Sequence, residues 1–482
     1  MMRFHTLLAL VLGTIITPPP ASAQEADLAL AHVTIVDVES GALHADQTVL
    51  IHGGRIAWTG PAARARIPAG ARVVDATGKY AIPGLWDMHV HTSREGRALH
   101  FWPQFLAYGV TGVREMGSYL DSLQYWRARA RQPGSGAPRI IYSSPMLDGN
   151  PPAWRHGYGV ADSAAAVAAV DTMAALGFDF LKVYVRLPRD AYFAIARRAR
   201  ERGIPFAGHV PGTVTPLEAS DAGQRSLEHI DERVYLACVP DGLARLDAYL
   251  AARQAGAPAD SVNAAEGRAI DALLTGANPE NCRPMLERMV ANGTWITPTL
   301  VVSRGLNPTP EMMADPRIRY VPPGLAQRWA SRRRSGEEAD IDRRINAQME
   351  RMAGLLQAAG VGILAGTDAS DEAWVFAGSG LHDELALLVD AGLTPLQALQ
   401  AATLNPARYL GAADSMGTVA AGRVADLVLL DANPLDDIRN SMRIFAVVHA
   451  GHLIGAAERE RLLRVAEQEA ARANIAPPAR QD

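Results

Sequence analysis

The sequence predicts an α/β fold: a (β/α)8 barrel of the TIM type with a small β-sandwich domain built from both chain ends. Three observations predict it. Short β-rich runs lie near both ends, and between them eight short apolar runs alternate with helical stretches of roughly 10–20 residues. The 482 residues also suffice for one large barrel with attachments. Eight strands are the number that closes such a barrel.

Residues 1–23 are typical of a secretory signal peptide. Arg3 supplies a positive start, residues 7–16 form a short apolar core, and Ala21-Ser22-Ala23 is a small-residue cleavage site. The alternative is a membrane anchor, but the apolar run is shorter than the about 20 residues that a span needs. We expect an exported protein, periplasmic or secreted, that has no membrane contact after cleavage.

The mature chain divides into a barrel flanked by two β-rich parts. We expect residues 24–80 and 413–460 to form the two parts of the sandwich, 81–412 to form the barrel, and 461–482 to form a terminal helix and tail. The barrel strand candidates are residues 84–91, 110–115, 139–144, 180–185, 205–209, 226–229, 294–300 and 362–367. Insertions at 234–291 and 301–348 follow strands six and seven, where substrate-facing loops belong.

Composition excludes several classes of protein and of site. The net charge of −4, from 47 basic and 51 acidic residues, gives no reason to expect a nucleic-acid partner. Two cysteines exclude a disulfide scaffold and a cysteine-only zinc site, so any metal must be held by histidines and carboxylates. Cys238 and Cys282 lie 44 positions apart in one insertion, and they either pair in an oxidising compartment or remain free thiols.

Potential metal ligands recur at the ends of the predicted barrel strands. His89 and His91 end the first strand and share one face of it, because side chains alternate along a strand. His209, His229 and Asp368 end three further strands. In a closed barrel such side chains converge on the interior, so we expect a metal site there. Apart from His156, the remaining histidines lack this arrangement and are expected on the surface or in turns.

Lys182 stands in the apolar strand candidate at residues 180–185. A buried ammonium is costly unless it is paired or neutralised. Carboxylation by CO2 turns this lysine into an anionic ligand that bridges two ions. The alternative is a lysine hydrogen-bonded to a nearby carboxylate.

These motifs resemble the metal-dependent amidohydrolase superfamily, in its imidazolonepropionase-like and Xaa-Pro dipeptidase-like branch. The resemblance spans residues from about 28 to 455, and the pieces that carry it are Pro83-Gly84-Leu85-Trp86-Asp87-Met88-His89-Val90-His91, Gly109-Val110-Thr111-Gly112-Val113-Arg114-Glu115, Lys182, His209, Glu228-His229, Ala365-Gly366-Thr367-Asp368 and Ala425-Asp426-Leu427-Val428.

The resemblance implies a two-metal hydrolytic centre. It assigns His89, His91 and Asp368 to one ion, and His209 and His229 to the second, with carboxylated Lys182 and a hydroxide between the ions. Asp368 is then the general base and acid. Zinc suits such ligands best, with manganese and cobalt as alternatives. If Lys182 is unmodified, the centre holds one ion.

Polar residues near strand ends are the candidates for substrate binding. They are Arg114, Tyr142, Arg155, His156, Tyr184 and Tyr235. An arginine or a Tyr–His set binds a substrate carboxylate through charge-assisted hydrogen bonds. The dipeptidase-like branch commonly has a Gly-Gly-His-Gly loop after the third strand, and here only His156-Gly157 matches it.

The sequence thus predicts an exported metal-dependent amidohydrolase acting on an amide bond of a small molecule, a dipeptide or an N-acyl amino acid. The alternatives are hydrolysis of a cyclic amide or lactone, and a catalytically inactive binding or sensor protein. Both a monomer and a homo-oligomer are compatible with the sequence.

Overall fold

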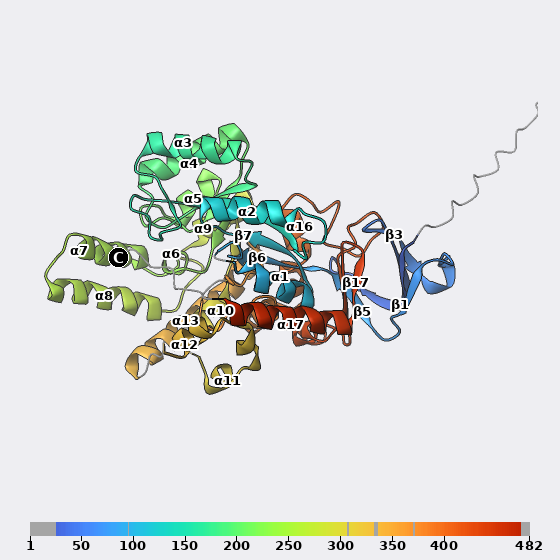
Figure 1. Cartoon of the computed structure of the whole chain (residues 1–482). Helices are drawn as coiled ribbons and strands as arrows, with labels where there is room; N and C mark the ends of the chain where they lie inside the picture. The colour runs from blue at the N-terminus through green and yellow to red at the C-terminus, as the bar shows by residue number, and fades with distance from the viewer. Residues whose placement is uncertain (1–25, 95, 306–307, 332–335, 370–371, 474–482) are drawn as a thin grey trace, which may run out of the picture.

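The computed structural model describes residues 26–94, 96–305, 308–331, 336–369 and 372–473, and the predicted signal peptide lies outside them. Two sheets organise the molecule (Figure 1). A parallel sheet occupies the centre, and the strands of both chain ends lie together at one end of the molecule. No helix in the described part is long and apolar enough to cross a membrane.

The central sheet follows the predicted barrel strands. Its described strands run in the order β14-β13-β12-β11-β10-β8-β7-β6, every neighbouring pair is parallel, and β9 (Tyr158–Gly159) pairs with β8. The bounds are β6 Leu85–Val90, β7 Val110–Glu115, β8 Arg139–Asp148, β10 Phe180–Val183, β11 Phe206–Gly208, β12 Ser226–Glu228, β13 Trp295–Thr297 and β14 Gly362–Ile363.

The two edges of this sheet also meet. The Met88 amide donates to the Ala365 carbonyl (2.9 Å), and the Asp368 amide donates to the His89 carbonyl (2.7 Å). Val90 forms a parallel bridge with Ala369. The sheet therefore curls round on itself as a TIM-like barrel requires.

Helices cover the barrel and pack into one large apolar cluster with its strands. Their bounds are α1 Ala98–Ala107, α2 Leu120–Ala130, α3 Ser163–Ala175, α4 Arg189–Arg202, α5 Pro216–Ala222, α9 Arg283–Asn292, α14 Ser379–Asp390, α15 Pro395–Ala401 and α16 Leu404–Tyr409. Local sequence sets their ends. Thr215 and Thr394 each cap a helix through a complete capping box, and Gly203 ends α4 in the left-handed conformation.

Both chain ends contribute to the second sheet. Its described strands are β1 Leu28–Val36, β2 Leu43–His52, β3 Arg55–Pro61, β4 Arg72–Asp75, β5 Tyr80–Pro83, β15 Leu427–Leu430, β16 Ile444–His449 and β17 His452–Ile454. They form one hydrogen-bonded sheet in the order β17-β16-β15-β5-β1-β2-β3, with β4 paired to β1. An apolar cluster joins side chains from both ends. The expected joining of the chain ends is thus present, and a division into two facing sheets stays a prediction.

The two insertions are helical. The first carries α6 (Glu232–Leu236), α7 (Gly242–Gln254) and α8 (Ala259–Leu274), and the α7–α8 pair projects from the barrel (Figure 1). A disulfide between Cys238 and Cys282, whose Cα atoms are 4.5 Å apart, closes its base and confirms the paired alternative. The second carries α10 (Leu300–Gly305), α11 (Pro310–Met313), α12 (Pro323–Ser331) and α13 (Glu337–Ala358).

The terminal helix α17 (Ala456–Arg472) begins five residues before the predicted start at residue 461 and contacts α1. Three short 3-10 turns complete the described elements: η1 Ala62–Arg64, η2 Pro316–Tyr320 and η3 Ile438–Met442.

Candidate metal centre

The predicted ligands converge at the carboxyl ends of the barrel strands. Asp368 Oδ1 lies 3.6 Å from His89 Nε2 and 3.3 Å from His91 Nε2, and Asp368 Oδ2 lies 3.9 Å from His229 Nε2. The His209 and His229 rings are 4.8 Å apart between centroids. Within the described residues, ligand atoms of His89, His229 and Asp368 all lie within 4.8 Å of one another. One centre therefore unites side chains from strands far apart in the chain.

Hydrogen bonds at Nδ1 orient three of the rings. His91 Nδ1 donates to the Gly117 carbonyl (2.7 Å), and His89 Nδ1 lies 2.8 Å from Glu228 Oε2. His229 Nδ1 lies 2.6 Å from Thr299 Oγ1. Because a carbonyl or carboxylate partner makes Nδ1 the donor, a neutral ring of His89 or His91 keeps its lone pair on Nε2, which faces Asp368.

Burial keeps these imidazoles neutral. It lowers the pKa of His89, His91 and His209 well below the usual value, and nearby cations, Lys182 among them, add to the effect. A neutral imidazole is the form that binds a metal. The electrostatics of the centre therefore favour ligation over protonation.

Three polar atoms at the centre are buried without a hydrogen-bond partner among the described residues: Lys182 Nζ, His209 Nδ1 and Asp368 Oδ1. The Lys182 side chain is completely buried, and burial lowers its pKa to about 8. The alternative of a lysine hydrogen-bonded to a carboxylate is therefore absent from the described contacts. A buried amine or carboxylate oxygen without a hydrogen-bond partner is costly. A bound metal group would supply the missing partners.

The backbone at the ligands is held in uncommon conformations. Asp368 and His229 have φ values of 55° and 67°, although neither is glycine. Gly208, just before His209, has φ 143°, and a Cβ there would lie 2.1 Å from the Val183 carbonyl oxygen. Strain of this kind persists where the surroundings impose it, which is common at functional sites.

Asp87 ties two ligand strands together beneath the centre. Its Oδ2 accepts from Thr367 Oγ1 (2.6 Å), and its Oδ1 accepts from the Thr367 and His89 amides (2.9 and 3.3 Å). Burial raises the pKa of Asp87 to about 7. Asp87 was not among the predicted site residues, although it stands two positions before His89.

Arg114 holds Glu228 rather than facing a substrate. Its guanidinium is completely buried, and Nη2 donates to both oxygens of Glu228 (2.8 Å each). The other donors reach the Met88 carbonyl, Ser226, Thr297 and Tyr409. No donor remains for a substrate, so the expected contact is corrected to a positioning role: Arg114 fixes the carboxylate that orients His89.

Tyr184 and His156 do lie beside the centre. The Tyr184 ring is 4.4 Å from the His209 ring, and its hydroxyl accepts from Trp154 Nε1 (2.8 Å). The Trp154 ring stacks 5.9 Å from that of His156. Burial lowers the pKa of His156 to about 2, so its ring is neutral. These three side chains form an aromatic wall next to the metal ligands.

The other substrate candidates lie elsewhere. The Tyr142 side chain lines a different cavity, among residues at the amino ends of the strands. The Tyr235 hydroxyl donates to the Thr275 carbonyl (2.5 Å), which places it in the first insertion. Arg155 is exposed in the loop after β8. His100 and His382 are buried rather than on the surface as expected; His382 is held by Ser441 and the Tyr108 carbonyl.

Comparison with known proteins agrees with this geometry. The structure is similar to bottromycin amidohydrolase (TM-score 0.69, 24% identity, 92% of this chain and 90% of that chain). It is also similar to a Xaa-Pro dipeptidase with bound methionine in the active site (TM-score 0.64, 18% identity, 89% of this chain and 100% of that chain). At these identities the likeness shows the fold.

Curated relatives match parts of the chain. The imidazolonepropionase of Pseudomonas fluorescens is 26% identical over 278 residues, which cover 55% of this chain and 67% of that protein. The adenine deaminase of Mesorhizobium japonicum is 46% identical over 66 residues, 14% of this chain, and the match spans only 11% of its length. The sequence profile of the amidohydrolase family matches residues 80–454. That match covers most of the chain, and the chain therefore belongs to the amidohydrolase family.

Proposed function

We propose that this protein is an exported, metal-dependent amidohydrolase that cleaves the amide C–N bond of a small molecule. The observation that carries the proposal is the single centre formed by four histidines, Asp368 and the unpartnered Lys182. A chain that had lost catalysis would not need to keep every ligand together with these unpartnered polar atoms.

The residues fit divalent metal ions. His89, His91 and Asp368 would hold one ion and His209 and His229 the second, with Lys182 between them as a carboxylated bridge. Zinc suits this mixture of imidazole and carboxylate best. When bound, such ions polarise a substrate carbonyl and lower the pKa of a water molecule, so that hydroxide is available near neutral pH.

Lys182 is suited to carboxylation. Carboxylation needs the neutral amine, whose nitrogen adds to the carbon of CO2 and releases one proton, leaving an anionic carbamate. With its pKa lowered to about 8 by burial, Lys182 presents a larger neutral fraction than an exposed lysine does. The carbamate also removes the cost of an unpaired buried ammonium.

Asp368 is the proposed proton carrier. Burial raises its pKa, an effect that His229 and Lys182 oppose. A carboxylate in this position accepts the proton of the attacking water as the oxygen bonds to the carbonyl carbon. It then delivers that proton to the amine nitrogen as the C–N bond breaks.

The proposed substrate is a dipeptide or an N-acyl amino acid. The similarity to a Xaa-Pro dipeptidase and to bottromycin amidohydrolase supports this class. The wall of Trp154, His156 and Tyr184 offers an apolar surface beside the ligands. A cyclic amide is the second candidate, because the match to imidazolonepropionase extends over 278 residues.

A substrate screen with the zinc-loaded mature protein tests the proposal. Dipeptides, N-acyl amino acids, cyclic amides and lactones form the panel, and bound metal is measured on the same preparation. We expect amide hydrolysis that Asp368→Asn lowers by at least about a hundredfold. Asp171→Asn, on α3 in an ion pair with Arg198, should leave it unchanged. Absence of bound metal, or equal turnover by Asp368→Asn, contradicts an enzymatic role. Turnover of lactones alone contradicts the amide assignment.

Export has its own test. We propose cleavage before Gln24 and a location outside the cytoplasm, without nucleic-acid or membrane partners. Mass analysis of the mature amino terminus from extracytoplasmic fractions checks this, and an intact Met1 in the cytoplasmic fraction contradicts it.

A further inference from the structure

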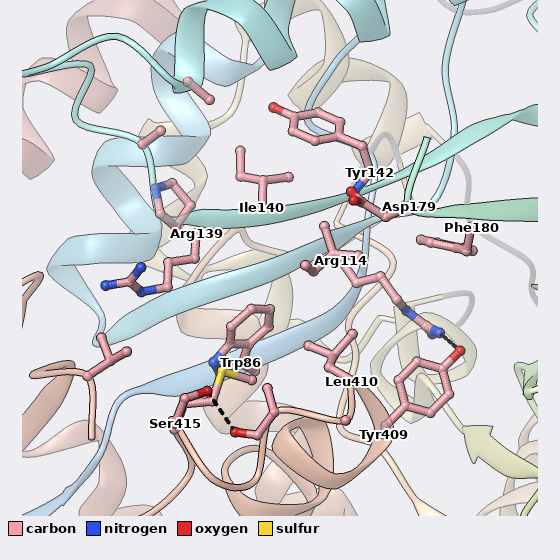
Figure 2. Close-up of a pocket in the computed structure, with 18 of the residues that line it drawn as sticks. Trp86, Arg114, Arg139, Ile140, Tyr142, Asp179, Phe180, Tyr409, Leu410 and Ser415 are labelled. Atoms are coloured by element: carbon pink, nitrogen blue, oxygen red, sulfur yellow. Dashed lines mark hydrogen bonds between the residues drawn. The ribbon is translucent and has the colours of Figure 1, made fainter. Parts of the chain in front are cut away.

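A cavity lies at the amino ends of the barrel strands, whereas the metal ligands lie at their carboxyl ends. Figure 2 shows residues that line this cavity. Arg139 at the start of β8, Phe180 at the start of β10 and Arg225 just before β12 line it, so it opens at the amino ends of the strands. The chain that follows α16 and the β16–β17 turn close its other side. Its volume is about 840 Å³, within the usual range for small-molecule pockets of about 300–1,000 Å³.

The floor of this cavity is apolar and aromatic. Trp86, Ile141 and Tyr409 belong to a buried apolar cluster that fills the lower end of the barrel. Ile140 and Ile141 remain half-buried although they are in a barrel strand. Apolar side chains left partly exposed in a concave surface favour a bound apolar group.

The rim carries an excess of positive charge. Arg127, Arg131 and Arg225 line the cavity without a carboxylate partner among the described residues, whereas the lining aspartate, Asp179, accepts the Tyr142 amide (2.7 Å). Arg139 is neutralised by Asp426 (2.5 Å). Arginines that lack an acidic partner at a concave site attract an anion.

One of these guanidiniums is held ready for a ligand. Arg225 Nη2 donates to the Tyr409 carbonyl (2.6 Å), and its Cζ lies 5.1 Å from the centre of the Tyr409 ring. Arg225 is otherwise exposed, so its remaining N–H groups are open to solvent. A guanidinium positioned in advance loses less side-chain entropy on binding and can pair with both oxygens of a carboxylate.

We propose that this cavity binds a small aromatic carboxylate, with the ring on the Trp86–Ile141–Tyr409 floor and the carboxylate at Arg131 and Arg225. The charge of the rim selects an anion, and the size and apolar floor select a small organic molecule. The amino-terminal face of such barrels ordinarily serves packing, so a ligand-sized, cationic cavity there calls for a separate role from catalysis.

Calorimetric titration of the zinc-loaded mature protein with indole-3-acetate tests the proposal, with the neutral indole-3-acetamide as the matched ligand. We expect the carboxylate to bind at one site, at least about tenfold more tightly than the amide, a difference of about 1.4 kcal/mol. Arg131→Gln and Arg225→Gln each weaken binding about tenfold. Arg129→Gln is the control, because Arg129 lies on α2, as Arg127 does, but does not line the cavity. It should change the binding affinity less than about twofold.

Three results would overturn the proposal: equal binding of acid and amide, unchanged affinity in Arg131→Gln, or loss of binding when the metal is removed by a chelator. The last result assigns the carboxylate to the metal centre instead. Arg131 is exposed and makes no described ion pair, so Arg131→Gln keeps the test valid even if Arg225→Gln impairs folding.

Discussion

Replacing Arg114 by methionine removes the cation that binds Glu228 inside the barrel. Both side chains are completely buried, and the two Nη2 contacts to Glu228 measure 2.8 Å. Burial raises the pKa of Glu228, and Arg114 with Lys182 more than offsets this, so that it lies below its usual value. In Arg114→Met the carboxylate therefore stays buried without its main counter-charge.

The expected cost follows from that isolated charge. Breaking a buried pair by removing one partner costs about 3–5 kcal/mol of the free energy of unfolding. The lost bonds to Ser226 and Tyr409 add little, because these two hydroxyls already lie 3.1 Å apart and can pair with each other. In Arg114→Met/Glu228→Gln neither member of the pair carries a charge, so the double variant should lose about 1–3 kcal/mol less than the two single losses together.

Urea unfolding of the metal-free proteins, followed by tryptophan fluorescence, measures these losses without the added stability from bound metal. Arg129→Met, an exposed arginine on α2, is the control and should stay within about 0.5 kcal/mol of the parent. A loss below about 1 kcal/mol for Arg114→Met, or strict additivity in the double variant, refutes the reasoning.

Three further predictions concern other parts of the molecule. Cys238→Ser/Cys282→Ser opens a loop of 44 positions and should cost about 4 kcal/mol; limited proteolysis should cut α7–α8 faster, and an unchanged rate contradicts this. Gly208→Ala places a Cβ 2.1 Å from the Val183 carbonyl and should lower bound zinc per chain, whereas Gly70→Ala, which meets nothing within 4 Å, should not; equal zinc in both variants speaks against the steric argument. The hydrogen bond from Arg189 lowers the pKa of Glu218 from 4.5 to about 2, so its contribution is present above pH 4.5 and is lost as the pH falls toward 2. Glu218→Gln should therefore flatten the acid side of the stability profile by less than about 1 kcal/mol, since the pair is partly exposed, and an unaltered profile between pH 5 and 2 contradicts it.

Strand positions and metal ligands could be predicted from sequence because each depends on a short local pattern. An apolar run bounded by polar residues predicts a strand, and a histidine at its end predicts a side chain at the carboxyl edge. His209 and His229 needed nothing more. The contact between Met88 and Ala365 joins the two edges of the central sheet. It was expected from the number of predicted strands, because neither residue by itself indicates the pairing.

The role of Arg114 could not be predicted in this way. Its place in the strand was evident, but its partner Glu228 lies 114 positions away, and no local pattern shows that the two meet inside the barrel. The substrate contact expected for Tyr235 was wrong for a similar reason. Tyr235 follows the sixth strand, but it lies on helix α6, and its hydroxyl donates to the Thr275 carbonyl at the end of α8. Pairings between distant segments decide both positions.

The discontinuous end sheet has a consequence for biosynthesis. β5 pairs with β1 on one side and with β15 on the other. The second side of β5 can therefore pair only after β15, which includes Leu427, has been synthesised. At about 5–20 residues per second, a ribosome takes roughly 20 to 70 seconds to make the intervening chain. During that interval β5 presents an unpaired edge, the kind of surface that templates aggregation. A message truncated before codon 427 would therefore yield a chain whose barrel segment is nearly complete but whose sheet edge stays open.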